Sequence, residues 1–221
     1  MTRRKLSLCY KILTILSLSA GILINVIKTS SVSAILSYYT LQSNILCFVV
    51  FTTIVVLEMR NSSYKTDVYY LIKGAITVAI LITGITYLCA LAPMGFQMDF
   101  QQKTLANTTI SNLLVHVVSP ILVTADYFLF DKKGNFKKYY PIIWLFIPFD
   151  YILYVYTYGS SGGKFFNIGG SQKFAYFFLD YEKIGYLGVV KWIVLITICI
   201  LCVSYLLVWI DKKMRGKTEH R

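Results

Sequence analysis

Long apolar runs alternate with short polar connections along the whole chain. Six runs are long enough to cross a bilayer as helices: residues 7–27, 34–57, 68–91, 110–130, 139–158 and 186–210. At about 1.5 Å per residue, each reaches roughly 30 Å, the thickness of a bilayer's hydrocarbon core. The longest connection, residues 159–185, is too short and too glycine-rich to fold separately. The pattern therefore predicts an all-α, polytopic membrane protein, with residues 1–221 forming a single bundle.

Composition and charge support this class and predict an orientation. The chain is 57% apolar and only 14% charged. With the amino terminus inside, 16 of the 22 lysines and arginines fall on the inner side. This positive-inside asymmetry predicts a cell-membrane protein with both termini in the cytoplasm. The net charge of +12 is spread over separate loops, which argues against nucleic acid as a partner and favours attraction to anionic lipid.

Polar side chains inside the spans are the candidates for function, because hydrocarbon disfavours them. The segment "SYYTLQSNIL", residues 37–46, enters the second span with the four polar residues Thr40, Gln42, Ser43 and Asn44. His116 lies alone in the fourth span, and Asp150 lies in the fifth without an opposite charge nearby in sequence. A carboxylate at a helix centre costs about 2.5–3.5 kcal/mol on insertion scales, so we expect a compensating partner.

Counting along the predicted spans places these groups at similar depth. Thr40 and His116 each lie six residues from the outer end of their span, which is roughly 9 Å below the boundary, and Asp150 lies roughly 12 Å below it. Asn44 is one turn deeper than Thr40 on the same helix face, and Asn112 is one turn above His116. Three helices are therefore expected to bring a Thr, a His and an Asp together.

Structural interpretations exist for each of these residues. Thr40 could cap a helix or bond to a neighbouring helix, and Asp150 could pair with Lys191 or a tyrosine. Asp126 and Asp131 precede Lys132 and Lys133, which is typical of charge pairing at the membrane interface.

Two further segments carry weaker signals. The outer segment "KFAYFFLDYEKIGY" is rich in aromatic residues and is expected to lie on the bilayer, either as an amphipathic helix over the site or as a plain anchor. Cys199 and Cys202 have redox or metal spacing but lie within an apolar run, which favours packing. We expect no metal and no cofactor.

The motif "YYTLQSN" before an apolar span, followed by "HVVSPILVTAD" in the fourth, resembles the androgen-induced and androgen-dependent six-span membrane hydrolases and their bacterial relatives. In that family a Thr near the start of the second span and a His in the fourth form the catalytic pair. The resemblance implies Thr40 as nucleophile and His116 as base, acting on fatty acid esters of hydroxy fatty acids. It also implies the six-span layout with inward termini.

These residues are suited to ester chemistry. A Thr hydroxyl becomes nucleophilic when a base removes its proton, and His can do so near neutral pH. We expect Asn44 to donate to the oxyanion and Asp150 to orient His116, with Asn112, Ser43 and Gln42 supporting the site. The substrate would be a membrane lipid or fatty acyl ester entering from the outer leaflet. A proton-coupled transporter and a non-catalytic lipid-binding protein remain alternatives, and the oligomeric state is open.

Overall fold

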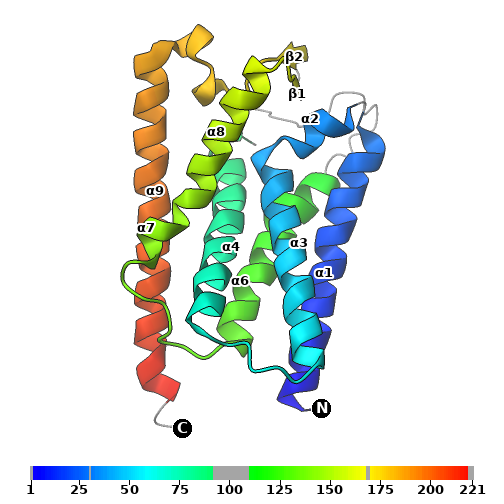
Figure 1. Ribbon diagram of the computed structural model, residues 1–221, viewed down its shortest axis with the longest axis vertical. Coiled ribbons are helices and arrows are strands. Elements are labelled where there is room, and N and C mark those ends of the chain that lie inside the picture. The colour runs from blue at the N-terminus through cyan, green and yellow to red at the C-terminus, as the bar shows by residue number, and fades with distance from the viewer. Residues whose placement is uncertain (1, 30, 92–109, 168–169, 219–221) are drawn as a thin grey trace.

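The computed structural model describes residues 2–29, 31–91, 110–167 and 170–218. Within them, six helices are long and apolar enough to cross a membrane, which confirms the six-span prediction. The first span begins and the sixth span ends at the same end of the bundle, here called the terminal end (Figure 1). The six spans are Arg3–Ile27, Tyr39–Met59, Asp67–Cys89, Ile110–Phe130, Tyr140–Ser160 and Tyr181–Arg215.

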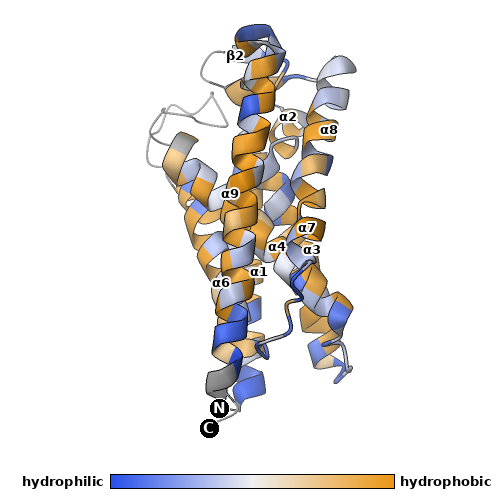
Figure 2. Ribbon diagram, turned by 90° about the vertical axis from the view of Figure 1, so that its left-hand side faces the viewer, coloured by the Kyte–Doolittle hydropathy of each residue, from blue (hydrophilic) through white to orange (hydrophobic). Residues whose placement is uncertain are grey.

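The surface of this bundle suits hydrocarbon. Figure 2 shows apolar residues along the middle of the helices and hydrophilic ones toward both ends of the bundle. Large apolar side chains point outward on several spans, among them Leu16, Leu153, Leu187 and Leu206, each more than half exposed. Cys199 and Cys202 also lie exposed on α9, so the expected packing of these two cysteines inside the bundle is not observed. An exposed apolar surface of this extent is what a bilayer-embedded protein presents.

The second predicted span is divided into two helices. Following α1 (Arg3–Lys28), the chain forms the short α2 (Val32–Leu36) and then α3 (Tyr39–Met59). The Ser37 hydroxyl donates to the Ser33 carbonyl over 2.7 Å, a local bond that competes with helix continuation. Tyr38 then has extended backbone angles and precedes α3 without a side-chain cap. Thr40 therefore lies in the first turn of α3, and Tyr38 takes the capping position that was considered for Thr40.

Two π-helical segments face each other where the third and fourth spans meet. The helix α4 (Asp67–Thr86) continues into η1 (Tyr87–Leu91), and η2 (Leu114–Val118) leads into α6 (Ser119–Phe130). Pro120 explains η2, because its ring clashes with the carbonyl four residues earlier and its nitrogen cannot donate. The Ser119 N–H accordingly donates to the Leu114 carbonyl, five residues back. The widened turn contains His116, and such turns are frequent at functional sites.

The close approach of these two spans depends on a glycine. A Cβ on Gly84 would lie 2.9 Å from the His116 carbonyl oxygen and 3.3 Å from Pro120 Cγ. Real Cβ atoms are not found that close to a backbone oxygen. Gly84 therefore lets α4 pack directly against the π-turn that carries His116.

The chain between the fifth and sixth spans forms a folded strap. After α7 (Tyr140–Trp144) and α8 (Phe146–Ser160), strands β1 (Phe165–Asn167) and β2 (Gly170–Gln172) pair antiparallel, with Phe165 opposite Gln172. The segment then passes through η3 (Phe177–Leu179) into α9 (Tyr181–Thr218). Gly185, with φ of 69°, interrupts α9, so the straight part of this span begins where the sequence predicted.

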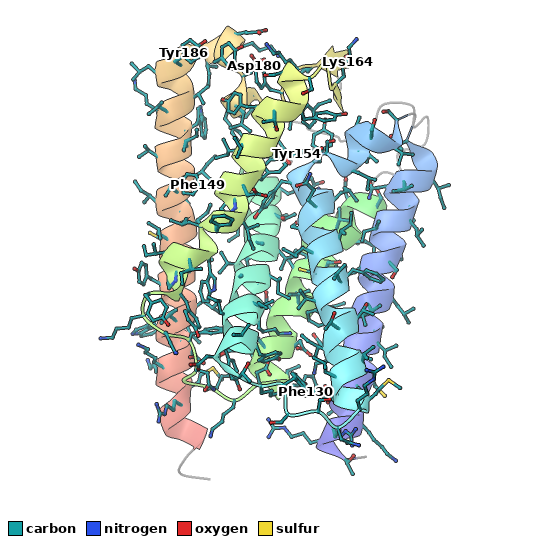
Figure 3. All side chains as sticks on the ribbon, viewed as in Figure 1. Phe130, Phe149, Tyr154, Lys164, Asp180 and Tyr186 are labelled. Atoms are coloured by element: carbon teal, nitrogen blue, oxygen red, sulfur yellow. The ribbon has the colours of Figure 1, made fainter. Side chains whose placement is uncertain are left out.

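The aromatic strap enters the bundle, which differs from the expected amphipathic helix on the bilayer. Phe174, Ala175, Tyr176, Phe178 and Leu179 are all buried and belong to one cluster with side chains of α2, α3 and α8. Figure 3 shows Asp180, Tyr186 and Lys164 at the end remote from Phe130 and the termini. The strap thus closes the bundle at the end opposite the termini.

A buried ion network joins four helices near the terminal end. Asp126 of α6 accepts from Lys73 of α4 at 2.6 Å and pairs with Lys11 of α1 at 3.3 Å. Lys11 also pairs with Glu58 of α3 at 3.4 Å. Lys11, Lys73 and Asp126 are each at most 1% exposed. The expected pairing of Asp126 with Lys132 and Lys133 is therefore wrong: burial inside the bundle gives the carboxylate closer partners from other helices.

A second polar cluster fixes the connection between α6 and α7. The Asp211 carboxylate of α9 accepts from the backbone N–H groups of Gly134 at 2.8 Å and Phe136 at 3.0 Å. Asp131 pairs with Lys65 at 2.7 Å, whereas Lys133 donates to the backbone carbonyl of Asp131. Asp131 thus joins two connections at the terminal end, through Lys65 in place of the expected neighbouring lysines.

Candidate functional site

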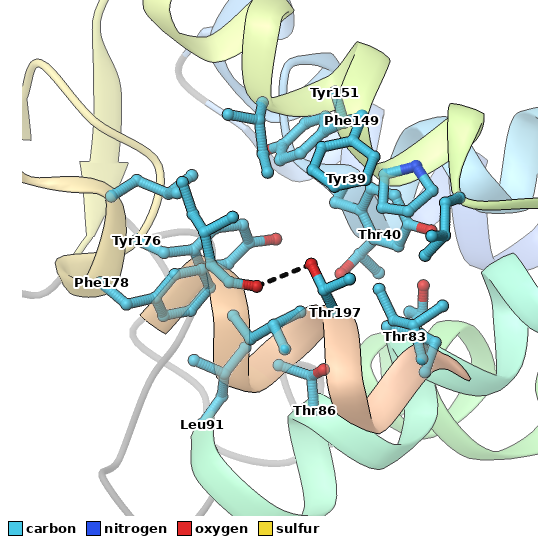
Figure 4. Close-up of a pocket in the computed structure, with 18 residues that line it drawn as sticks. Tyr39, Thr40, Thr83, Thr86, Leu91, Phe149, Tyr151, Tyr176, Phe178 and Thr197 are labelled. Atoms are coloured by element: carbon cyan, nitrogen blue, oxygen red, sulfur yellow. Dashed lines mark hydrogen bonds between the residues drawn. The ribbon is translucent and has the colours of Figure 1, made fainter. Parts of the chain in front are cut away.

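An apolar pocket lies in the half of the bundle remote from the termini, between α3, α4, α8, α9 and the strap (Figure 4). It holds about 730 Å³ of empty space, part of it open to the outside. Its hydroxyl-bearing residues are Tyr39, Thr40, Thr83, Thr86, Tyr151, Tyr176 and Thr197. The rest of the lining is hydrophobic, which suits an alkyl chain.

Thr40 forms part of the wall of this pocket. Its side chain is 3% exposed and lies in the first helical turn of α3. A residue in that position is close to backbone N–H groups that have no partner within the helix. The positive end of the helix dipole therefore favours negative charge developing near Thr40.

His116 lies outside the pocket lining, in the π-turn of η2. Its ring stacks on Tyr87 with centroids 4.0 Å apart and an interplanar angle of 7°. The side chain is 1% exposed, and neither ring nitrogen has a hydrogen-bond partner among the described residues. The Thr83 backbone carbonyl faces the ring without reaching hydrogen-bond geometry. A buried imidazole with both nitrogens unpaired is costly, and such a group in a span points to function.

Asn44 connects the helix of Thr40 with the turn of His116. Its Nδ2 donates to the Thr40 carbonyl at 2.7 Å and to the Val115 carbonyl at 3.2 Å. Both amide protons are thus engaged, while Oδ1 has no partner in the described part of the chain. Asn44 is consequently not placed to donate to an oxyanion as expected. It holds the two candidate elements together.

Thr40 and His116 belong to neighbouring elements but share no hydrogen bond, since the ring nitrogens are unpaired. Ser43 gives a second link, because its hydroxyl shares a hydrogen bond of 2.8 Å with Thr83 Oγ1. Thr83 lines the pocket together with Thr40, and its carbonyl faces His116. Asn44 and Thr83 thus each contact both the neighbourhood of Thr40 and that of His116.

The remaining predicted residues divide between two places. Asn112 is 8% exposed, one turn from His116 in the same span. Gln42 and Asp150 line a separate cleft between α3 and α8, together with Ser43. Asp150 is exposed and makes no hydrogen bond to His116. The expected Asp150–His116 pair is not formed, because α8 presents Asp150 to α3 while His116 faces η1.

Two tyrosines of the site were not identified from the sequence. Tyr151 of α8 donates to the Ser37 carbonyl at 3.2 Å, and Figure 4 shows the Tyr176 hydroxyl directed into the pocket. Burial raises the pKa of Tyr176 to about 12, although hydrogen bonds from Thr40 and Tyr39 oppose the rise. The Tyr176 phenol therefore stays protonated at neutral pH and can donate a hydrogen bond. In the sequence, the one feature that drew attention to Tyr176 was the high aromatic content of the segment that became the strap.

No group of three or more His, Cys, Asp or Glu that could hold a metal ion occurs in the described ranges. The polar groups that line the pocket are hydroxyls. Comparisons with protein-family models, with curated proteins and with solved structures find no match to this chain. The geometry is therefore the basis for any assignment of function.

Proposed function

We propose that this chain is an intramembrane hydrolase of lipid acyl esters, with Thr40 as the nucleophile and His116 as the general base. The observation that carries the proposal is a buried Thr40 in the wall of an apolar pocket, with an unpaired imidazole in the element tied to it by Asn44. The pocket takes the acyl chain, and the ester carbonyl lies at Thr40. This assigns Thr40 and His116 the roles that the family resemblance implies.

The chemistry divides into two acyl transfers. Thr40 Oγ1 loses its proton to His116 and attacks the carbonyl carbon, and the alcohol leaves with a proton from His116. Water then attacks the acyl-threonine, again giving its proton to His116, and Thr40 leaves and recovers that proton. Because no hydrogen bond joins the two residues, proton transfer requires a bridging water or a rotation of the imidazole.

The oxyanion of each tetrahedral intermediate needs hydrogen-bond donors. Tyr176 supplies one, since its protonated hydroxyl is directed into the pocket near Thr40. The first turn of α3 adds the dipole of its N-terminus. In this proposal Tyr176 takes the role first expected for Asn44, whose amide protons are both engaged.

Location and orientation belong to the same proposal. The positive-inside pattern supports a cell-membrane protein with both termini in the cytoplasm, which places the Thr40 pocket in the outer leaflet. Peptide tags at either end should then resist protease added to intact cells and become sensitive after permeabilisation. A tag cleaved in intact cells would place the pocket in the inner leaflet.

Covalent labelling tests the proposed nucleophile directly. A long-chain fluorophosphonate should form one adduct, located at Thr40 by mass spectrometry, and Thr40→Ala should abolish it. Thr52→Ala is a matched control, because Thr52 lies on the same helix, is exposed and donates to its own helix carbonyl. Labelling at another residue, or labelling that persists in Thr40→Ala, would exclude Thr40 as the nucleophile.

A lipid-binding protein without turnover is the second candidate. The observation that favours it is the missing hydrogen bond between Thr40 and His116. In that case the pocket binds an acyl chain, Thr40 bonds to it or to Tyr176, and His116 only packs on Tyr87. A protein that binds fatty acyl esters but is neither labelled by the fluorophosphonate nor able to hydrolyse them would fit this function.

A further inference from the structure

A second opening, here called the lateral cleft, lies between α3 and α8. Its lining differs from that of the apolar pocket in being partly polar and acidic, and it contains Tyr39, Gln42, Ser43, Phe146, Asp150 and Tyr151. It holds about 600 Å³ of empty space, part of it open to the outside. Tyr39 and Tyr151 line both openings, and their rings pack edge to face with centroids 5.1 Å apart. The two openings are therefore neighbours across one aromatic wall.

Asp150 is the charged group of this cleft. It lies at the middle of the Tyr140–Ser160 span, and its side chain is exposed to the cleft. No ion pair to Asp150 is formed by any described residue, and no basic side chain is present among the described residues of the lining. A carboxylate in the middle of a membrane span requires compensation, and no residue that the structure describes provides a counter-ion there.

The other side chains favour an organic cation over a metal ion. Tyr39, Phe146 and Tyr151 supply aromatic rings, whose faces attract ammonium groups. Gln42 adds a polar side chain to the same lining. Tyr39 Oη is buried and has no hydrogen-bond partner within the described ranges. Calcium takes six to eight oxygen ligands, typically with several carboxylates, whereas the cleft offers one carboxylate.

We propose that the lateral cleft binds the ammonium group of an amphiphilic amine, which pairs with Asp150 and packs against the aromatic rings. The alkyl chain of such a ligand lies along the wall of Tyr39 and Tyr151 or extends from the cleft into the surrounding lipid. The site would serve a hydrolase as a recognition site for a basic lipid, but the binding itself does not depend on turnover. Because Asp150 does not pair with His116, its presence in a membrane span needs another explanation, and ammonium binding provides one.

A matched pair of photoreactive probes tests this site in the purified full-length protein. Dodecylammonium and dodecanol, each carrying a diazirine on the chain, would be irradiated with the protein in neutral detergent and the adducts mapped by mass spectrometry. The ammonium probe should label the segments 39–46 and 146–151 about tenfold or more above the alcohol, because only the cation gains the ion pair and the ring contacts. If both probes label the parent protein equally, the proposal is overturned without any variant being needed.

The variant Asp150→Asn should reduce ammonium labelling of these segments to the level of the alcohol. It removes the charge at nearly constant volume, and its elution profile and melting temperature verify the fold. The control Glu182→Gln removes a carboxylate that is exposed and paired with Lys173 at the outer end, so ammonium labelling of the cleft should persist. Undiminished labelling in folded Asp150→Asn would contradict the site. Loss of labelling with retained ester hydrolysis would separate this binding from the proposed reaction.

Discussion

Asn44 Nδ2 lies 3.2 Å from the Val115 carbonyl oxygen and 2.7 Å from the carbonyl oxygen of Thr40. One buried amide thus bridges the first turn of α3 and the π-turn that carries His116. Because both amide protons are used, the bridge positions the two elements and leaves the oxyanion to other donors. In the proposed mechanism the donor is Tyr176 of the folded strap, whose hydroxyl is directed into the pocket.

Replacing Asn44 by Ala should therefore destabilise the protein more than it alters the chemistry. The Val115 carbonyl would lose this donor in a buried site, which costs about 1–3 kcal/mol. Thermal unfolding in detergent should show the loss, while the pH dependence of ester hydrolysis should keep its shape at temperatures where the variant is folded. If the variant is as stable as the parent but hydrolyses esters more than a hundredfold more slowly, Asn44 would instead be assigned as a hydrogen-bond donor to the oxyanion.

The Tyr176→Phe variant tests the replacement donor. Removal of one oxyanion donor lowers kcat by about 10²–10³ in well-studied hydrolases, and a comparable loss is expected here with little change in KM. Tyr154→Phe is a suitable control, since this hydroxyl bonds to Ser37 at 2.7 Å and is absent from the pocket lining. Parent-like turnover in Tyr176→Phe would remove Tyr176 from the mechanism.

The buried ion network should be sensitive to the loss of a single partner. Among the described residues, Lys73→Met leaves Asp126 with the longer contact to Lys11, and breaking a buried pair costs about 3–5 kcal/mol. Lys137→Met removes an ion pair that is well exposed on both sides, and should change stability by about 1 kcal/mol or less. Similar melting temperatures for the two variants would mean that the network contributes nothing specific to folding.

Lys133 gives the stability of the protein a defined pH dependence. Burial lowers the pKa of its ammonium group to about 8, against the opposing effects of Asp131 and Asp211. Between pH 8 and about 10.4 the unfolded chain holds a proton that the folded protein has lost, so this residue makes stability rise with pH in that window. Below pH 8 both states are charged and the contribution is constant.

Comparison of melting temperatures across pH 7 to 10.5 isolates this effect. Above pH 8 the melting temperature of Lys133→Met should rise less steeply with pH than that of the parent, because the variant lacks the titration of Lys133. The other titrating groups are common to both proteins. Parallel curves for parent and variant would show that the pKa of Lys133 is not lowered.

The six spans could be predicted because each apolar run is a local property of the sequence. The ion network could not, because Lys11, Lys73 and Asp126 meet only when three helices pack at one level. Lys11 and Lys73 did give a signal, since each lies beside or inside an apolar run. Counting basic residues by side treated both as part of the inner surface, whereas the fold buries them.

The candidate site was predictable only in part, because residue types are local properties of the sequence whereas contacts between helices are not. Thr40 and His116 were identified by residue type and by resemblance, and the structure places them in elements joined by Asn44. The position of Asp150 depends on which face of α8 turns toward α3, and an apolar span with polar residues on several sides does not fix that face. The break at Ser37 and Tyr38 was also missed, so the second span was predicted to begin at residue 34, whereas its helix begins at Tyr39.

The central claim is that Thr40 and His116 act as one catalytic unit on a lipid ester. The most direct measurement is the rate of hydrolysis of a long-chain acyl ester in liposomes by the parent, Thr40→Ala, His116→Ala and the double variant, with Thr52→Ala as control. A nucleophile and its base act together, so each single variant should lose about 10²–10⁴-fold or more and the double variant should be no slower. Hydrolysis at the parent's rate by folded Thr40→Ala would contradict the account.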